Sequence, residues 1–263
     1  MNFQPKLKEV EMKNMVKNIC AAMVISLCAA GHLFATENNP NNDNKFMEEN
    51  LNLIQEWDKT FPQSDKVNHK KITFHNRYGI TLAADLYVPK NVTGKLPAIA
   101  ISGPFGAVKE QASGLYAQTL AERGFLTIAF DPSYTGESSG QPRYVASPDI
   151  NTEDFSAAVD YLSTRDDVDA ERIGILGICG WGGMALNAAA IDTRIKATVT
   201  ATMYDMSRVN ANGYFDSMNA DARHELRRQL NAQRTEDYRN GTFALGGGVV
   251  DPLPADAPQF VKD

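Results

Sequence analysis

Long apolar runs alternate with helical patterns through the middle of this chain. Continuous apolar segments cover residues 96–103, 125–131 and 172–177, and each is followed by a segment with apolar residues at helical spacing. Uninterrupted apolar strands separated by helices are typical of a parallel sheet that helices cover on both faces. The pattern therefore predicts an α/β fold with a mostly parallel, three-layer arrangement.

The limits of the expected elements follow from these runs and from turn residues. Gly124 is placed to end one helix, Thr152 to cap the next, and Arg77–Gly79 to form the turn between two edge strands. The predicted strands cover residues 70–76, 80–89, 96–103, 125–131, 172–177 and 195–205, and the predicted helices between them cover 109–124, 153–167 and 182–191.

The first 35 residues have the pattern of a secretory signal peptide. Lys13 and Lys17 precede the uncharged run "ICAAMVISLCAA", and the small residue Ala35 ends the segment. The run is too short to span a bilayer. We therefore expect an exported protein, periplasmic or secreted, that loses residues 1–35 and has no stable membrane insertion afterwards.

Outside the sheet region the chain divides by composition. Residues 36–65 begin with the polar stretch "TENNPNNDNK" and continue with apolar residues at helical spacing, so we expect a polar leader and an N-terminal helix. The α/β core is expected over residues 66–205. Residues 206–240 predict helices that form either a cap over a site or a solvated surface. Residues 241–263 are Gly- and Pro-rich and are expected to be irregular.

Charge and cysteine content limit the classes of function. The net charge is −6, and removal of residues 1–35 makes it more negative, which disfavours nucleic acid as a partner. Cys20 and Cys28 lie in the predicted signal peptide, so Cys179 is the one cysteine expected after export. Metal-ligand spacing and a phosphate-binding glycine loop are both missing from the sequence. We expect a small-molecule or peptide substrate, with no metal and no cofactor.

The stretch "GICGWGG" at residues 177–183 follows the apolar run "RIGILG" and precedes a helical pattern. With the loops "SGPFG" after one strand and "DPSYTGESSG" after the next, it resembles the α/β-hydrolase fold, and within it the dienelactone-hydrolase-like and acyl-peptidase-like exported hydrolases. The resemblance covers roughly residues 66–240. It implies hydrolysis of a small ester, lactone or acyl-peptide bond through a covalent intermediate, at a nucleophile in the turn between strand and helix.

Two residues compete for the nucleophile position in this turn. Centred on Cys179, the motif has the small Gly177 two residues before but Trp181 two residues after; centred on Trp181, both flanking positions are small but the nucleophile is absent. A thiolate at a helix N-terminus would be stabilised there, and the alternative is a small buried cysteine without a chemical role. Ser138 in "GESSG" matches G-x-S-x-G, but its surroundings predict a loop.

Other site residues are weaker candidates. Backbone N–H groups near Phe105, together with that of Gly180, could form an oxyanion hole, and Trp181 is expected to wall the pocket. Asp205 is a candidate acid, although its position also suits the N-cap of a short helix. Lys109 and Glu110 are interpreted as surface residues. In this fold a base histidine follows the last strand, and none of the histidines here occupies that place.

The resemblance therefore implies a site that is incomplete in this sequence. We expect two further strands after the helical segment in this fold, and the chain as given does not include them, so we predict weak activity. Two alternatives to a hydrolase remain open: a non-catalytic α/β-hydrolase-like binding protein with Trp181 as a stacking platform, and an inactive fragment.

Overall fold

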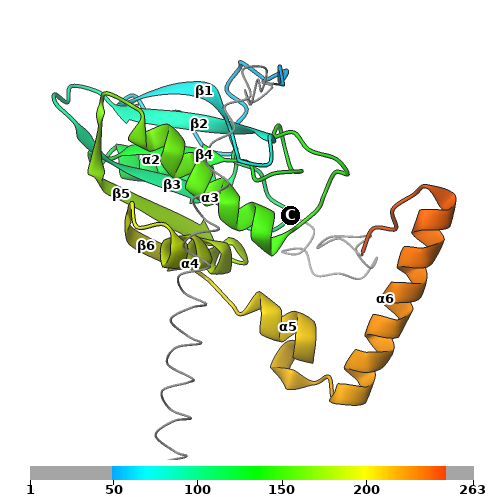
Figure 1. Ribbon diagram of the computed structural model, residues 1–263. Coiled ribbons are helices and arrows are strands. Elements are labelled where there is room, and N and C mark those ends of the chain that lie inside the picture. The colour runs from blue at the N-terminus through cyan, green and yellow to red at the C-terminus, as the bar shows by residue number, and fades with distance from the viewer. Residues whose placement is uncertain (1–48, 247–263) are drawn as a thin grey trace, which may run out of the picture. The chain divides into compact units, whose positions relative to one another are not determined.

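A single six-stranded sheet organises the computed structural model, which describes residues 49–246. The strands are β1 (Val67–His75), β2 (Thr81–Pro89), β3 (Leu96–Ser102), β4 (Leu126–Phe130), β5 (Val168–Ile178) and β6 (Ile195–Ala201). Their order across the sheet is β1-β2-β4-β3-β5-β6 (Figure 1). The last four strands of the chain run parallel, whereas β1 and β2 pair antiparallel. The predicted mostly parallel sheet is confirmed.

Helices connect the parallel strands and continue after β6. The helices are α2 (Ala112–Ala121), α3 (Pro148–Ser163), α4 (Trp181–Ile191), α5 (Met206–Asn212), the 3-10 helix η1 (Tyr214–Asp216) and α6 (Ala220–Asn240). One helix stands between each consecutive pair of parallel strands, which is the connection that parallel pairing requires. The α/β pattern read from the apolar runs is therefore the observed order of elements.

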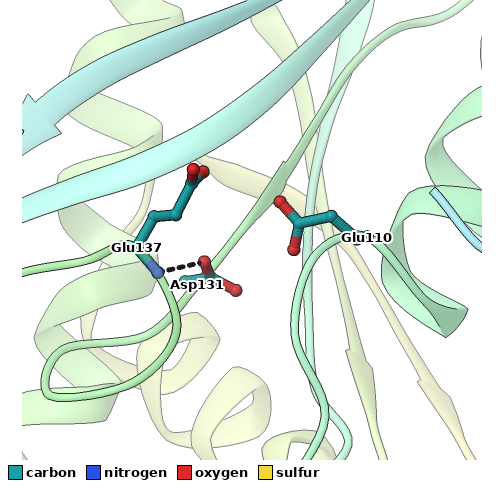
Figure 2. A group of neighbouring side chains, drawn as sticks. All are labelled: Glu110, Asp131 and Glu137. Atoms are coloured by element: carbon teal, nitrogen blue, oxygen red, sulfur yellow. Dashed lines mark hydrogen bonds between the residues drawn. The ribbon is translucent and has the colours of Figure 1, made fainter. Parts of the chain in front are cut away.

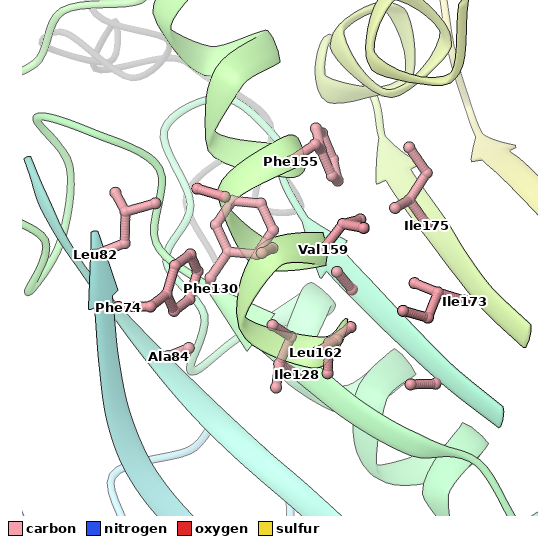
Figure 3. Close-up of a cluster of buried hydrophobic side chains, with 14 of the residues drawn as sticks. Phe74, Leu82, Ala84, Ile128, Phe130, Phe155, Val159, Leu162, Ile173 and Ile175 are labelled. Atoms are coloured by element: carbon pink, nitrogen blue, oxygen red, sulfur yellow. The ribbon is translucent and has the colours of Figure 1, made fainter. Parts of the chain in front are cut away.

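The larger hydrophobic core lies between the sheet and helices α3 and α4 (Figure 3). Residues two apart on a strand share a face, and this places Leu82 with Ala84 and Ile173 with Ile175 in the same layer. From α3, the residues Phe155, Val159 and Leu162 are fully buried against them.

A second cluster lies on the opposite face of the sheet, under α2. Ala117 and Ala121 of α2 pack there with Ile101 and Leu176, and the partly buried Cys179 contacts the same cluster. Helices therefore cover both faces of the sheet, and Cys179 lies at its edge between the two layers.

The face of β5 and β6 beside α2 is partly open. An apolar hollow of about 610 Å³ is lined by Leu120, Phe125, Leu176 and Val199. Val199 is 53% exposed, and β6 is the edge strand of the sheet among residues 49–246. The strand predicted at this place is confirmed, and its side chains are partly or fully exposed.

The predicted N-terminal helix is wrong over its described part, because residues 49–60 form neither helix nor strand. Their backbone N–H groups bond to distant partners instead of to carbonyls four residues earlier. Ile54 donates to Oε1 of Glu137 at 2.7 Å, and Thr60 donates to the carbonyl of Glu110 at 3.0 Å. Tertiary partners therefore replace the helical pattern that the apolar spacing suggested.

Several limits of the elements differ from those predicted. Helix α3 begins at Pro148 instead of after Thr152, because proline fits the first helical position and the preceding Ser147 is extended. Helix α2 begins at Ala112 instead of at Lys109, and β6 ends at Ala201. Such shifts of a few residues do not alter the order of elements.

The chain beyond β6 is helical, as predicted for residues 206–240. Asn219 caps α6 by accepting a hydrogen bond from the N–H of Ala222, and Gly241 ends the helix in a left-handed conformation. The helix buries none of its side chains. Its role as a cap over a site stays a prediction.

Several predicted segments lie outside the described residues. These are the signal peptide, the polar leader up to residue 48, and residues 247–263 of the irregular segment. The chain divides into one unit over Met1–Lys45 and a second over Phe46–Asp263, and every described residue belongs to the second. Within residues 49–246 we find no helix with the length and apolarity needed to cross a bilayer.

Candidate active site

Cys179 occupies a strained turn between β5 and α4. Strand β5 ends at Ile178, helix α4 begins at Trp181, and the φ of Cys179 is +57°. Left-handed φ values are uncommon for residues other than glycine and store strain that the surroundings must hold. The Cys179 N–H donates to the carbonyl of Ala201 at 2.9 Å, which ties the turn to the end of β6. The predicted sharp turn at Cys179 is therefore confirmed.

The competing motif centred on Trp181 is wrong, because Trp181 is the first residue of α4. Close packing explains the glycine before the turn. A Cβ on Gly177 would lie 2.2 Å from the carbonyl oxygen of Trp181, so only glycine fits there. A Cβ on Gly182 would lie 2.7 Å from the side chain of Met203. The turn is thus closed around Cys179 by neighbouring backbone.

The loop after β3 packs directly on this turn. Gly103 has φ +97°, and a Cβ there would lie 2.4 Å from the carbonyl oxygen of Ile178. The ring of Phe105 covers Gly180, because a Cβ on Gly180 would lie 2.0 Å from ring atom Cε2. Among the described residues, the N–H groups of Phe105 and Gly180 have no acceptor. An unpaired N–H directly after Cys179, with a second on the loop that packs against it, is the kind of arrangement that an oxyanion hole requires.

Trp181 forms a buried wall beside the turn. Trp181 is 3% exposed, and its ring packs edge-on against the ring of Phe105, with 4.4 Å between the ring centroids. The indole Nε1 has no hydrogen-bond partner within residues 49–246. The expectation that Trp181 avoids bulk water is confirmed, and its burial leaves little of the ring for stacking on a ligand.

Tyr204 approaches Cys179 from the side of β6, a contact that the sequence did not indicate. It lies three residues beyond the end of β6, and its hydroxyl interacts with the Cys179 thiol. Burial, followed by the interaction with that thiol, raises the pKa of Tyr204 above its ordinary value. Tyr204 therefore stays protonated at neutral pH and offers the sulfur a hydrogen-bond donor.

Asp205 serves the helix that follows it. Its Oδ1 accepts hydrogen bonds from Ser207 Oγ at 2.6 Å and from the N–H of Arg208 at 2.9 Å. The hydrogen bond from Ser207, together with that from the N–H of Arg208, lowers the pKa of Asp205. The N-cap interpretation is confirmed, and these bonds engage the carboxylate that was the candidate acid.

Ser138 is a structural turn residue. Its side chain is buried, and Oγ donates to the carbonyl of Asp131 at 2.7 Å while accepting from the N–H of Ala83 at 2.9 Å. These bonds hold the 132–140 loop against β2. The literal G-x-S-x-G match is therefore a loop motif, as its sequence context indicated.

Two of the histidines, His69 and His224, lie on elements outside the turn. His69 on β1 bonds through Nε2 to Oδ1 of Asp85 at 2.8 Å, and His224 lies exposed on α6. Asp85 is fully buried and also pairs with Lys59 at 2.9 Å. His69 thus hydrogen-bonds to the buried carboxylate with which Lys59 also pairs.

Lys109 and Glu110, predicted as surface residues, are central to a buried group that we name the Lys109 cluster: Lys71, Lys109, Glu110, Asp131 and Glu137. Lys109 Nζ lies 2.5 Å from Glu110, 2.9 Å from Asp131 and 2.6 Å from Glu137. The Lys109 side chain is 0% exposed. The surface interpretation was wrong because the partners of Lys109 come from remote parts of the sequence.

The three carboxylates of this cluster converge as metal ligands can (Figure 2). Here the Lys109 ammonium contacts an oxygen of each, so a cation already balances them. Burial alone would lower the pKa of Lys109, but the charges of Asp131 and Glu110 outweigh burial and raise it. The ammonium therefore remains charged across the physiological range.

The parallel sheet, the strained turn after β5 and the close-packed loop after β3 together define an α/β hydrolase. Residues 78–244 match the family described as X-Pro dipeptidyl-peptidase (S15 family). The chain belongs to this family.

Two relatives are similar over most of this chain. Protein PA2218 of Pseudomonas aeruginosa is 63% identical over 244 residues, covering 92% of this chain and 64% of the relative. Protein YcjY of Escherichia coli is 43% identical over 68% of this chain and 59% of the relative. The chain thus spans less than two thirds of the length of these curated relatives.

More distant similarities carry functional descriptions. Thiohydrolase aneE of Aspergillus aculeatus is 29% identical over 52% of this chain and 42% of its own length.

Among solved structures, PA2218 superposes with a TM-score of 0.77 at 64% identity, covering 82% of this chain and 67% of that one. The α/β hydrolase GrgF of Penicillium sp. sh18 has a TM-score of 0.57 at 22% identity, covering 68% and 57%, and supports the fold alone.

Proposed function

We propose that this protein is an exported acyl hydrolase that cleaves small ester, thioester, lactone or acyl-peptide bonds through an acyl-Cys179 intermediate. The observation that carries the proposal is the positive φ of Cys179 at the turn between β5 and α4, next to the unpaired N–H of Gly180. A strained nucleophile beside free donors is the arrangement used for acyl transfer.

The chemistry follows from this geometry. The Cys179 thiolate attacks the acyl carbonyl carbon, and the carbonyl oxygen becomes an oxyanion within reach of the N–H groups of Gly180 and Phe105. Collapse of this intermediate breaks the bond to the leaving group, which departs with the electron pair and takes a proton from water. Water then attacks the thioester on Cys179, which releases the carboxylic acid and regenerates the Cys179 thiol.

The leaving group decides which of these bonds is cleaved fastest. His69 bonds to Asp85, and the group that we find interacting with the Cys179 thiol is the hydroxyl of Tyr204. A raised pKa makes Tyr204 a donor and a poor base. Thiolate and phenolate leaving groups depart without protonation. We therefore propose thioesters and aryl esters as the preferred substrates. The thiohydrolase among the similar proteins supports this choice.

A burst experiment tests the proposal. The purified chain is mixed with p-nitrophenyl butyrate or with butyryl-N-acetylcysteamine, and product release is followed together with the intact mass. We expect one butyryl group on the peptide that contains Cys179, and slow turnover afterwards. Cys179→Ala should abolish both, whereas Ser138→Ala, at the competing motif, should keep the adduct. An adduct that persists in folded Cys179→Ala would refute the proposal.

Export rests on the pattern of residues 1–35. The chain is expressed in a Gram-negative host with a C-terminal tag, and the periplasmic fraction is collected. We expect a product whose N-terminus lies near residue 36. Full-length protein found only in the cytoplasm would contradict export without affecting the proposed chemistry.

A further inference from the structure

We propose that Lys109 is a positioning residue that holds the loop of residues 103–108 against the turn at Cys179, so that Phe105 stays packed on Gly180. This inference rests on the proposed function of Cys179. It concerns how the candidate oxyanion hole is built, and it follows from the way the two ends of one short loop are fixed.

The far end of the loop is fixed by Lys109. Its backbone N–H donates to Oδ1 of Asp131 at 2.8 Å, and its Nζ donates to Oδ2 of the same carboxylate at 2.9 Å. Asp131 directly follows β4, the strand that pairs with β3 in the sheet. One carboxylate at the sheet edge thus holds both the main chain and the side chain of Lys109.

Further contacts make this attachment rigid. The N–H of Glu137 donates to Oδ2 of Asp131 at 2.9 Å, as the dashed line in Figure 2 marks. Glu110 and Glu137 point their carboxylates at the same ammonium. Because the side chains of Lys109 and Asp131 are both fully buried, removal of Lys109 would leave the Asp131 carboxylate without its cation, which is strongly unfavourable.

The near end of the loop is fixed by the turn at Cys179. Gly103 lies against the carbonyl of Ile178, and the Phe105 ring lies on Gly180 and Trp181. The loop therefore spans from the turn to the Lys109 cluster, with a fixed point at each end. Release of the far end would loosen the hold on Phe105, because its ring would then be held on Gly180 only by the packing at the near end.

Lys71 provides a matched control. It is also buried, with a side chain 3% exposed, and its Nζ also pairs with Glu110 at 3.2 Å and Glu137 at 2.7 Å. It lies on β1, however, and pairs with Asp58, Glu110 and Glu137 instead of with Asp131. Lys71→Met therefore removes a buried charge from the same cluster without removing the direct attachment of the loop.

The experiment uses the fluorescence of Trp181 as a readout independent of catalysis. The full chain contains two tryptophans, so Trp57→Phe leaves Trp181 as the single reporter. In this background we compare acrylamide quenching of Trp181, the urea midpoint, and kcat and KM for p-nitrophenyl butyrate, in Lys109→Met and Lys71→Met.

We expect Lys109→Met to increase quenching of Trp181 severalfold and to lower kcat by about 10- to 100-fold with little change in KM, since small displacements of catalytic groups cost rates of this order. Lys71→Met should lower the urea midpoint while leaving quenching and kcat near those of the parent. If Lys109→Met does not fold, Asp131→Asn is measured in its place, with the same expected direction.

Each outcome decides the inference. Unchanged shielding of Trp181 in the folded Lys109 or Asp131 variant overturns it, as does an equal change in Lys71→Met. If the parent forms no acyl-enzyme but Trp181 becomes exposed in Lys109→Met alone, the positioning role stands and the proposed function fails.

Discussion

A single methyl group added at Gly180 would test how closely the loop and the turn are packed. Gly180 has φ −59° and ψ −29°, a helical conformation that alanine adopts without strain. The added Cβ would lie 2.0 Å from Cε2 and 2.3 Å from Cδ2 of Phe105. No real contact is that short, so the ring must move. Any cost of Gly180→Ala is therefore attributable to Phe105.

The magnitude depends on where the ring goes. If it swings away, it loses its edge-on contact with Trp181, worth about 0.5–1.5 kcal/mol, and some burial. If it stays, overpacking costs about 1–3 kcal/mol. We therefore expect Gly180→Ala to lower the free energy of unfolding by about 1–3 kcal/mol. In a Phe105→Ala background the clash is gone, and the same change should cost little, because alanine adopts the φ and ψ of Gly180 without strain.

Urea unfolding of the four proteins in this double-mutant cycle measures the coupling between the two positions. We expect the cost of Gly180→Ala to disappear when Phe105 is absent, a coupling of about 1–3 kcal/mol. Equal costs in both backgrounds would show that the ring does not lie on Gly180, and would remove the basis for placing the Phe105 loop at the oxyanion position.

Three further changes probe other parts of the site. Asp205→Ala should lower the urea midpoint slightly, through loss of the N-cap of α5, and leave acylation of Cys179 unchanged; a lost acylation would make it catalytic. Gly103→Ala, at φ +97° and 2.4 Å from a carbonyl oxygen, should cost more than about 2 kcal/mol and slow acylation. Burial alone would raise the pKa of Asp58, but hydrogen bonds from Lys59 and Lys71 lower it from 3.8 to about 2. Its contribution is therefore complete above about pH 4 and lost as pH falls toward 2, a loss that Asp58→Asn should remove from acid unfolding curves.

The sheet and the turn could be predicted because their signals are local. The residues after Arg172 in the run "RIGILG" are buried within β5, and Gly177 is required by the backbone of Trp181, four residues later. Apolar continuity and small residues are visible in the sequence itself. The turn at Cys179 could therefore be predicted from its neighbours in the sequence.

The Lys109 cluster could not be found in the same way. Lys109 and Glu110 precede a helical pattern, where charged residues usually face water, and only folding brings Asp131 and Glu137 to them. One signal was available. Asp131 ends the predicted strand that follows the "SGPFG" loop along the chain, and the carboxyl ends of parallel strands meet at one edge of a sheet.

The predicted N-terminal helix failed for a related reason. Apolar residues at helical spacing occur in residues 49–60, but the N–H groups of Ile54 and Thr60 are taken by Glu137 and Glu110. Long-range hydrogen bonds of this kind are set by tertiary structure, and a single sequence gives no measure of them.

The apolar hollow beside α2 affects how the folded protein will behave toward reporter dyes. Dyes such as ANS fluoresce when they bind exposed apolar surface, and their signal is commonly taken as evidence of a loosened, molten state. A hollow of about 610 Å³ floored by β5 and β6 offers such a surface while the core remains packed. The native protein should therefore be ANS-positive, so near-UV circular dichroism, and not dye binding, is the appropriate test of whether its variants are folded.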